Sequence, residues 1–406
     1  MKIGVVGLGF VGLVTAAVLA MQNNKVTGID IDSSKVDSLK NERLYFHEPE
    51  LQNIISKHKS MMLFSTDFDD LVDTEVVFIT VPTPNIKGRI DTNFVQTAIE
   101  SILRSNSDAI VAIKSTVTPG TSSRFKEQYK AKIISNPEFL REGNAVQDTN
   151  NPDRIVIGGE EENVNVIENV WKFTGAPVIK TTRENAELIK YASNSFLATK
   201  ISFINEIANL CEKIPNCDIE VIAEGMGLDR RIGPRFLKAG IGFGGSCFPK
   251  DTKALISYAN QLGINLDLIS STLKINDDRI DRLIGHLKER FTDLSKLRIL
   301  QLGLSFKENT DDIRESPAQK LYLELIRNGA KVKVFDPVTK VNGIDICPSI
   351  EQCLDEVDVI IIATEWPHFK VLENLNIKIP VIDGRRILNP TKIPNYIGIG
   401  MYCERS

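Results

Sequence analysis

Short runs of consecutive apolar residues alternate with helical stretches through the first 180 positions. Apolar runs of this length, separated by helices, are typical of parallel sheets whose two faces are both covered. A helix over residues 12–22 follows the first run. The pattern therefore predicts a doubly wound α/β domain over residues 1–180. Its predicted strands are 2–7, 25–31, 76–81, 109–114, 132–135 and 154–157.

From about residue 182 the apolar residues recur with the spacing of an α-helix. Those at 197, 201, 204, 208 and 211 lie on one stripe. A second helical stretch covers 254–290. Alternation then returns with predicted strands at 297–302, 331–335 and 357–364, and Ser316-Pro317 fits a helix start. We expect a central helical domain over 181–292 and a second α/β domain over 293–406. The predicted architecture is two Rossmann-like, doubly wound parallel-sheet domains joined by a central helical region.

The composition is that of an ordinary globular protein. Of the 406 residues, 42% are hydrophobic and 25% charged, and the net charge of −4 gives no surface suited to nucleic acid. No signal peptide or membrane span is visible, so we expect a cytoplasmic protein that binds no membrane. The 4 histidines and 6 cysteines show no metal-ligand spacing, so we expect reduced thiols and no metal site.

A glycine-rich turn follows the first predicted strand. Gly7, Gly9 and Gly12 open a helix, and Asp30 ends the second strand. This spacing favours a dinucleotide site, in which the helix N-terminus faces a pyrophosphate and the carboxylate faces ribose hydroxyls. Asp30 would repel a 2′-phosphate, so NAD is favoured over NADP; a purely structural glycine turn is the alternative. The second sheet keeps only Gly303, which indicates a different nucleotide-like ligand.

Cys247 lies in the segment Gly-Phe-Gly-Gly-Ser-Cys-Phe-Pro-Lys-Asp over 242–251. A structural cysteine would more often lie among aliphatic residues on a regular element. Glycines instead allow a substrate to approach the backbone closely, and Asp251 follows within the same segment. The loop therefore indicates a nucleophilic thiol.

Two polar residues, Lys190 and Asn194, continue the apolar stripe of the long helix backwards, one turn apart. Lys190 either extends to the surface or serves a site in which it and Asn194 stabilise an oxyanion. Glu138 and Thr116 each follow a predicted strand, where open α/β sheets bind ligands. A solvated turn is the alternative for the segment around Glu138.

Taken together, these motifs resemble the UDP-glucose 6-dehydrogenase family nearly from end to end. Gly-Ser-Cys-Phe-Pro-Lys-Asp and Pro-Glu-Phe-Leu resemble the branch that acts on UDP-glucose rather than on N-acetylated sugars. The segments that carry the resemblance are GLGFVGL, VPTP, KSTVTPG, NPEFLREG, AELIKYASNSF, RIG, GFGGSCFPKDT, FKENTDDIRESP and DGRR.

The resemblance implies oxidation of the sugar C6 alcohol to a carboxylate, giving UDP-glucuronate, with two NAD and one water. A cysteine thiohemiacetal and a thioester would be the intermediates. The catalytic residues that it implies are Cys247 as nucleophile, Lys190 and Asn194 at the oxygen anion, Glu138 as hydrolytic base, Asp251 acting through a water, and Thr116 beside that water.

The same resemblance implies the binding residues. The implied NAD contacts are Gly7, Gly9, Val11, Gly12, Asp30, Lys35, Thr83, Thr116, Glu142, Lys250 and Arg314. The implied contacts to UDP-glucose are Glu138, Phe139, Leu140, Lys190, Asn194, Arg231, Phe243, Gly244, Lys307, Arg385 and Arg386, with Arg231 reaching the nucleotide of a neighbouring subunit. We accordingly expect a homodimer or a higher homo-oligomer.

Three other functions share parts of this pattern. A 6-dehydrogenase of UDP-N-acetylmannosamine or GDP-mannose would run the same reaction with a different sugar pocket. A two-electron β-hydroxyacid dehydrogenase would need neither the cysteine loop nor a second α/β domain. A non-enzymatic NAD sensor would not need the full set of Cys247, Lys190, Glu138 and Asp251.

Overall fold

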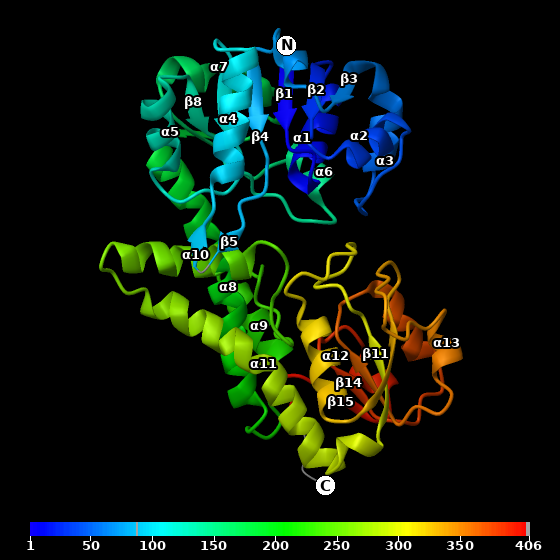
Figure 1. The fold of residues 1–406 in the computed structure, drawn as a ribbon. Helices are drawn as coiled ribbons and strands as arrows, with labels where there is room; N and C mark the ends of the chain where they lie inside the picture. Colours follow the sequence, from blue (N-terminus) through cyan, green and yellow to red (C-terminus); the bar gives the residue numbers. More distant parts are fainter. Residues whose placement is uncertain (87, 403–406) are drawn as a thin grey trace. The chain divides into compact units, whose positions relative to one another are not determined.

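The computed structural model describes residues 1–86 and 88–402, which form two compact units (Figure 1). The first unit is Met1–Ser193 with Lys253–Leu262, and the second is Asn194–Thr252 with the chain from Gly263 onward. Two helices, α8 (Arg183–Cys211) and α10 (Phe248–Gln261), contribute residues to both units.

The first unit is built on an eight-stranded sheet of order β10-β9-β8-β7-β4-β1-β2-β3. Neighbouring strands are parallel except β8 and β9, which meet antiparallel at Ser135 and Gly158. The six predicted strands are confirmed, whereas the two end strands, β3 and β10, lack the continuous apolar run because they are only partly buried. The strands are β1 (Lys2–Val6), β2 (Lys25–Ile29), β3 (Met62–Ser65), β4 (Val76–Ile79), β7 (Ile110–Ile113), β8 (Ile133–Ser135), β9 (Ile155–Gly158) and β10 (Val178–Thr181).

Helices cover both faces of this sheet, as expected for a doubly wound fold. Successive strand residues point to opposite faces. Val5 belongs to a core cluster with residues of α1, α3, α6 and α7, whereas Val6 belongs to a cluster with residues of α4 and α5. The helices are labelled in Figure 1. A two-stranded hairpin of β5 (Asn85–Ile86) and β6 (Arg89–Ile90) stands apart. The helices are α1 (Phe10–Met21), α2 (Ser33–Lys40), α3 (Leu51–His58), α4 (Asn93–Ser105), α5 (Thr121–Tyr129), α6 (Ala145–Asn150) and α7 (Glu161–Trp171).

The second unit contains a five-stranded, wholly parallel sheet of order β12-β11-β13-β14-β15. One face packs against α8, α11 and α12, and the other against α13 and a 3₁₀ segment over Pro367–Asn374. The first three strands in the chain were predicted; the three-residue β14 and β15 were not. The strands are β11 (Arg298–Leu302), β12 (Lys331–Phe335), β13 (Val359–Ile362), β14 (Val381–Asp383) and β15 (Tyr396–Gly398).

The helices that follow the cysteine loop require one correction. The single stretch predicted over 254–290 is two helices, α10 and α11 (Asp267–Phe291), because the chain turns at Gly263 with a φ of +74° that ends the first helix. The predicted start at Ser316 is confirmed: its hydroxyl accepts from the backbone N–H groups of Ala318 and Gln319 at the start of α12 (Pro317–Arg327). The remaining helices are α9 (Ile219–Gly227) and α13 (Ile350–Cys353).

Four of the six cysteines form disulfides, Cys211–Cys217 and Cys347–Cys353, so the expectation of reduced thiols is wrong for these four. The backbone brings their Cα atoms to 5.3 and 6.1 Å, within the range of a disulfide. Cys247 is in no disulfide, and Cys403 lies outside the described residues. In the part of the chain that the structure describes, no helix combines the length and apolarity needed to cross a membrane.

Candidate active site

The turn after β1 has the geometry of a phosphate-binding turn. Gly7 has a φ of +92°, which glycine adopts without strain, and a Cβ at Gly12 would lie 1.9 Å from the Gly7 carbonyl oxygen. A Cβ at Gly9 would meet nothing within 4 Å, so open space lies beside the backbone where α1 begins. The predicted contact Val11 is half-buried in the first turn of the same helix. The turn therefore fits a pyrophosphate at a helix N-terminus.

Asp30 lies directly after β2, and its carboxylate is tied to this turn. It accepts hydrogen bonds from the backbone N–H groups of Leu8 at 2.8 Å and Asp32 at 3.0 Å, and Lys35 Nζ lies 3.4 Å away. Tyr45 donates its hydroxyl to the Leu8 carbonyl oxygen, and burial together with Asp30 raises the pKa of Tyr45 well above its ordinary value. The carboxylate is thus held where a ribose bound against the turn would meet it, and Lys35 is beside it.

The other predicted NAD contacts lie in different parts of the chain. Thr83 is buried and donates its hydroxyl to the Thr116 carbonyl oxygen at 2.8 Å, so these two predicted residues are in contact. Glu142 is half-buried in the loop between β8 and α6. Lys250 and Arg314 belong to the second unit, where Arg314 pairs with the carboxylate of Asp312.

Glu138 and Lys190 form a buried ion pair within the first unit. Lys190 Nζ lies 2.7 Å from Glu138 Oε1, and the two residues are 3% and 7% exposed. Glu138 Oε2 also accepts from the Leu140 backbone N–H at 2.6 Å. Burial by itself would raise the pKa of Glu138, but Lys190 and this hydrogen bond hold it below its ordinary value. Lys190 therefore does not extend to the surface; it keeps the Glu138 carboxylate ionised.

An aromatic ring flanks this ion pair. The predicted substrate contact Phe139 lies with its ring centroid 5.5 Å from Lys190 Nζ and is covered on the ring by the Arg154 guanidinium at 3.9 Å. Phe139 and Leu140 are both half-buried in the segment that follows β8. The pair is thus bounded by apolar surface, which strengthens its electrostatic interaction.

Sequence reasoning missed a second buried lysine in this cluster. Lys114 follows β7, is 6% exposed, and places Nζ 4.9 Å from the centre of the Trp171 ring. Burial lowers its pKa to about 8, with Glu138 opposing the shift and Lys190 adding to it. Only its position at a strand end, beside Thr116, could have marked it in the sequence.

Asn194 and Asp251 form a second buried pair, in the second unit. Asn194 Nδ2 donates to Asp251 Oδ2 at 2.7 Å, and Lys250 Nζ lies 3.2 Å from the other carboxylate oxygen. Lys190 and Asn194 are successive-turn neighbours on α8, as predicted, and each contacts a different carboxylate. The helix therefore offers one cation and one neutral amide donor, both already oriented.

Cys247 immediately precedes α10 and is half-buried. Its Sγ lies 3.6 Å from the Ser246 hydroxyl oxygen, and its carbonyl oxygen accepts from the Asp251 backbone N–H at 2.8 Å. A helix N-terminus stabilises a nearby negative charge, which favours the reactive thiolate form. The structure thus places the thiol and Asp251 one helical turn apart in the second unit.

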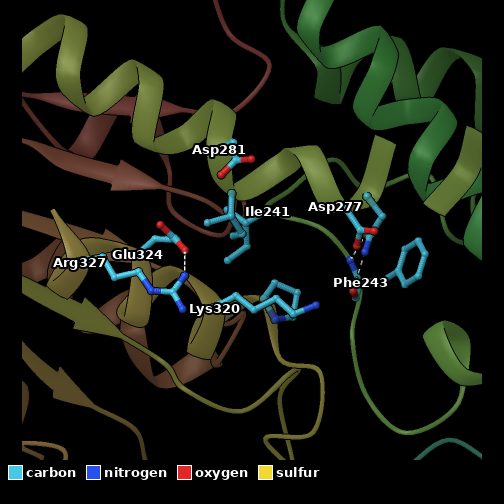
Figure 2. Close-up of a pocket in the computed structure, with 10 residues that line it drawn as sticks. Ile241, Phe243, Asp277, Asp281, Lys320, Glu324 and Arg327 are labelled. Carbon is cyan, nitrogen blue, oxygen red and sulfur yellow. Dashed lines mark hydrogen bonds and ion pairs between the residues drawn. The ribbon is translucent and has the colours of Figure 1, made fainter. Parts of the chain in front are cut away.

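The glycine loop before Cys247 is fixed from several sides. Asn276 binds both main-chain groups of Phe243, accepting from its N–H at 2.7 Å and donating to its carbonyl oxygen at 3.1 Å. A Cβ at Gly244 would lie 2.2 Å from the Glu315 carbonyl oxygen, so only glycine fits. Phe243 also lines a cavity of about 270 Å³ (Figure 2). Figure 2 shows Asp277 and Asp281 on α11 and Lys320, Glu324 and Arg327 on α12 around it.

Two predicted contacts of the sugar nucleotide differ in their surroundings at the end of β14. Arg385 donates to the carbonyl oxygens of Ala363 and Gly242, each at 2.9 Å, and so joins the sheet to the cysteine loop. Arg386 is buried and pairs with both carboxylate oxygens of Asp218 at 2.8 Å. Arg385 therefore ties the end of β14 to the glycine loop before Cys247, whereas Arg386 is engaged with Asp218.

Two further predicted contacts lie in loops. Arg231 is exposed and pairs with Asp229, and Lys307 is half-buried with Nζ 5.8 Å from the Phe306 ring centroid. Among the described residues, no group of three or more His, Cys, Asp or Glu side chains is arranged to hold a metal ion.

Three family models match successive parts of the chain. They describe the NAD binding domain, the central domain and the UDP binding domain of the UDP-glucose/GDP-mannose dehydrogenase family, over residues 1–173, 184–278 and 300–390.

The chain is also similar to named relatives. A UDP-glucose 6-dehydrogenase of Rickettsia bellii is 40% identical with 100% of both chains covered, and one of Bacillus subtilis is 39% identical over 96% of this chain and 90% of the relative. Among solved structures, a UDP-glucose dehydrogenase from Pyrobaculum islandicum is 35% identical, covers 98% of both chains, and has a TM-score of 0.92.

Proposed function

Because the chain belongs to the UDP-glucose/GDP-mannose dehydrogenase family, we propose that its own residues carry out the four-electron oxidation of UDP-glucose to UDP-glucuronate. The activity is that of an NAD-dependent UDP-glucose 6-dehydrogenase. The observation that carries the proposed mechanism is that α8 presents Lys190 and Asn194 one turn apart, each holding a buried carboxylate. Oxyanion stabilisation and proton transfer are thereby available on neighbouring turns.

The first oxidation converts the C6 alcohol into an aldehyde. NAD, when bound, supplies the hydride acceptor for both oxidations. Asp251 takes the hydroxyl proton through a water, while Lys190 and Asn194 stabilise the oxygen as it becomes negative. These two donors need no rearrangement of the backbone, because α8 fixes both.

The second oxidation takes place on Cys247. Its thiolate adds to the aldehyde carbon and forms a C–S bond, giving a thiohemiacetal whose oxygen again faces Lys190 and Asn194. Loss of the remaining C6 hydrogen as hydride leaves a thioester. Glu138 then removes a proton from water, which attacks the thioester carbon, and the C–S bond breaks to release the carboxylate and the Cys247 thiolate.

The binding residues for each ligand come from both units of the chain. We propose that Gly7, Gly9, Val11, Gly12, Asp30, Lys35, Thr83, Thr116, Glu142, Lys250 and Arg314 bind NAD. We further propose that Phe139, Leu140, Phe243, Gly244, Arg231, Lys307, Arg385 and Arg386 bind the UDP-sugar. The contact between Thr83 and Thr116 and the link from Arg385 to the cysteine loop support these assignments.

We also propose that the chain acts as a homodimer or a higher homo-oligomer in the cytoplasm. An exposed apolar stripe on α8 supports self-association: Phe196, Phe203 and Leu210 are 65%, 44% and 59% exposed and lie on one face, two turns apart. Phe203→Glu should lower the molar mass in solution, measured by light scattering. Phe94→Glu, at an exposed position on α4, is the matched control, and an unchanged mass for Phe203→Glu would contradict this interface.

The test of the function is the ratio of NADH to acid. Purified protein is given NAD and a panel of nucleotide sugars, and NADH is counted against each sugar acid released. UDP-glucose should be the best substrate and should give two NADH per UDP-glucuronate. A steady ratio of one with free aldehyde would overturn the four-electron reaction, and equal rates with UDP-N-acetylmannosamine would overturn the sugar assignment.

A further inference from the structure

Lys114 lies in the same buried cluster as the Glu138–Lys190 ion pair, and the chemistry proposed above gives it no role. It extends from the end of β7, whereas Glu138 follows β8 and Lys190 belongs to α8. Its electrostatic partners are Glu138, which attracts it, and Lys190, which repels it. The cluster thus holds two lysines against one carboxylate and carries an excess positive charge.

The position of Lys114 is fixed by an aromatic ring that is itself held in place. Its Nζ lies 4.9 Å from the centre of the Trp171 ring. The indole N–H donates to the Asn136 side-chain oxygen at 3.1 Å, and the Asn136 amide donates to the Val156 carbonyl oxygen at 2.8 Å. Since a desolvated cation is attracted to an aromatic face, this ring provides a specific position for a charged lysine.

The proposed function makes conflicting demands on Lys190. It must face the substrate oxygen during both oxidations and again when water attacks the thioester, yet at that last step it is also the cation closest to Glu138, at 2.7 Å. A buried carboxylate that loses its only cation gains a proton or is strongly destabilised. Glu138 in that state could not take a proton from water, so a second cation is required when Lys190 turns away.

We propose that Lys114 is a positioning residue that keeps Glu138 ionised while Lys190 turns towards the reacting oxygen. This inference rests on the proposed function, because it assigns Glu138 the role of hydrolytic base. Lys114 itself contacts neither substrate nor thioester; it acts through Glu138. The ammonium over Trp171 stays in place because β7 and the held ring, not the substrate, determine its position.

The charged groups around Glu138 set the pH dependence. Lys190 faces it from α8 and Lys114 from the end of β7, and the Arg154 guanidinium covers the neighbouring Phe139 ring; from α7 the neutral Trp171 faces the cluster. Burial lowers the pKa of Lys114 to about 8, so it is mostly charged at neutral pH. Removing the positive charge should raise the pKa of Glu138 and move the acidic limb of hydrolysis to higher pH.

The experiment compares Lys114→Met with Lys114→Arg in single-turnover reactions of the full chain with limiting UDP-glucose and excess NAD. NADH formation and acid release are followed between about pH 3 and 8, because the pKa of Glu138 lies below its ordinary value. For Lys114→Met, the midpoint of the acidic limb of acid release should rise by about one pH unit or more, because an adjacent opposite charge shifts a carboxyl pKa by that amount. Lys114→Arg should keep the wild-type profile. Lys132→Met, at the exposed start of β8, is the matched control and should also leave it unchanged.

Trp171→Leu provides a second variant, since Lys114→Met removes a buried group and could fail to fold. It retains the lysine but removes the aromatic ring that Lys114 contacts. The acidic limb of the pH profile for acid release should therefore move in the same direction by a smaller amount. An unchanged acidic limb in the folded variants overturns the inference. Glu138→Gln separates this failure from that of the proposed function: rapid acid release by that variant would overturn the role of Glu138 as hydrolytic base, whatever the Lys114 variants do. One NADH per acid with free aldehyde in the wild-type protein would instead overturn the four-electron reaction.

Discussion

The two sheets of the molecule begin with the same arrangement. Gly7 follows β1 with a φ of +92°, and Gly303 follows β11 with a φ of +100°. The next strand in each case ends at a carboxylate, Asp30 or Asp336, which accepts a 2.8 Å hydrogen bond from the backbone N–H of the residue after the glycine. The two turns therefore share the same backbone geometry, although only the first turn carries the three-glycine spacing.

The two turns differ in what they leave available for a ligand. In the first, α1 begins at Phe10 and its N-terminus faces open space; in the second, a loop over 303–316 comes before α12. Asp336 accepts five hydrogen bonds. Three come from the loop after Gly303, two of them from backbone N–H groups and one from a hydroxyl group, and the other two come from backbone N–H groups after β12. Its role is to hold the loop. The first turn suits a pyrophosphate, whereas the second sheet needs basic side chains for an anion.

The largest expected effect is a loss of stability caused by a substitution in the second turn, after β11. Gly303→Ala would place a Cβ 2.3 Å from the Thr364 hydroxyl oxygen at a positive φ, so unfolding free energy should fall by about 3 kcal/mol or more. Gly343→Ala is the matched control, because its φ is +84° but its Cβ would meet nothing within 4 Å. It should cost only about 1 kcal/mol. Denaturant unfolding of both variants decides this, and equal losses would show that contact with Thr364 does not matter.

At the first turn, after β1, an added methyl group should weaken cofactor binding and leave stability unchanged. Gly9→Ala adds a methyl group that meets no protein atom within 4 Å, so the melting temperature should stay unchanged. The KM for NAD should nevertheless rise by about tenfold or more, because the methyl group occupies the space proposed for the pyrophosphate. Gly225→Ala, also without atoms within 4 Å, is the control for a harmless methyl group. An unchanged KM for NAD would remove the pyrophosphate from this turn.

The two carboxylates, Asp30 and Asp336, should differ in how strongly they affect the preference for NAD over NADP. Asp30→Asn should raise the efficiency with NADP relative to NAD by about tenfold, since a negative charge close to the 2′-phosphate is removed. Asp336→Asn should lower stability and leave the NAD to NADP ratio unchanged. Comparing kcat/KM for both cofactors in both variants tests the assignment, and a shift of equal size in Asp336→Asn would contradict it.

The fold could be predicted where short-range patterns determine it. Buried apolar runs predicted β1, β2, β4, β7, β8 and β9, because strands covered on both faces are continuously apolar. The half-exposed end strand β3 and the reversed direction of β9 had no such signal, since pairing with distant segments decides them. The two disulfides likewise depend on turns that bring cysteines together, which their spacing does not specify.

The candidate site, like the fold, could be predicted only where short-range patterns determine it. The helical period placed Lys190 and Asn194 one turn apart, as found. It could not show that Lys190 would pair with Glu138, 52 residues away, or that Lys114 would come from a third element to the same cluster. Residue types and local spacing identified the chemistry, whereas the charge balance among these side chains depends on tertiary packing.

The central claim is that Cys247 carries the sugar as a thioester and that Glu138 releases it. The most direct measurement is the intact mass of Glu138→Gln after reaction with UDP-glucose and excess NAD. The variant should form two NADH per site and then gain the mass of a UDP-glucuronyl group, because the base for hydrolysis is missing. The double variant Glu138→Gln/Cys247→Ser should form no thioester and lose turnover by several orders of magnitude relative to wild type. Full acid release by Glu138→Gln with no added mass would contradict the account.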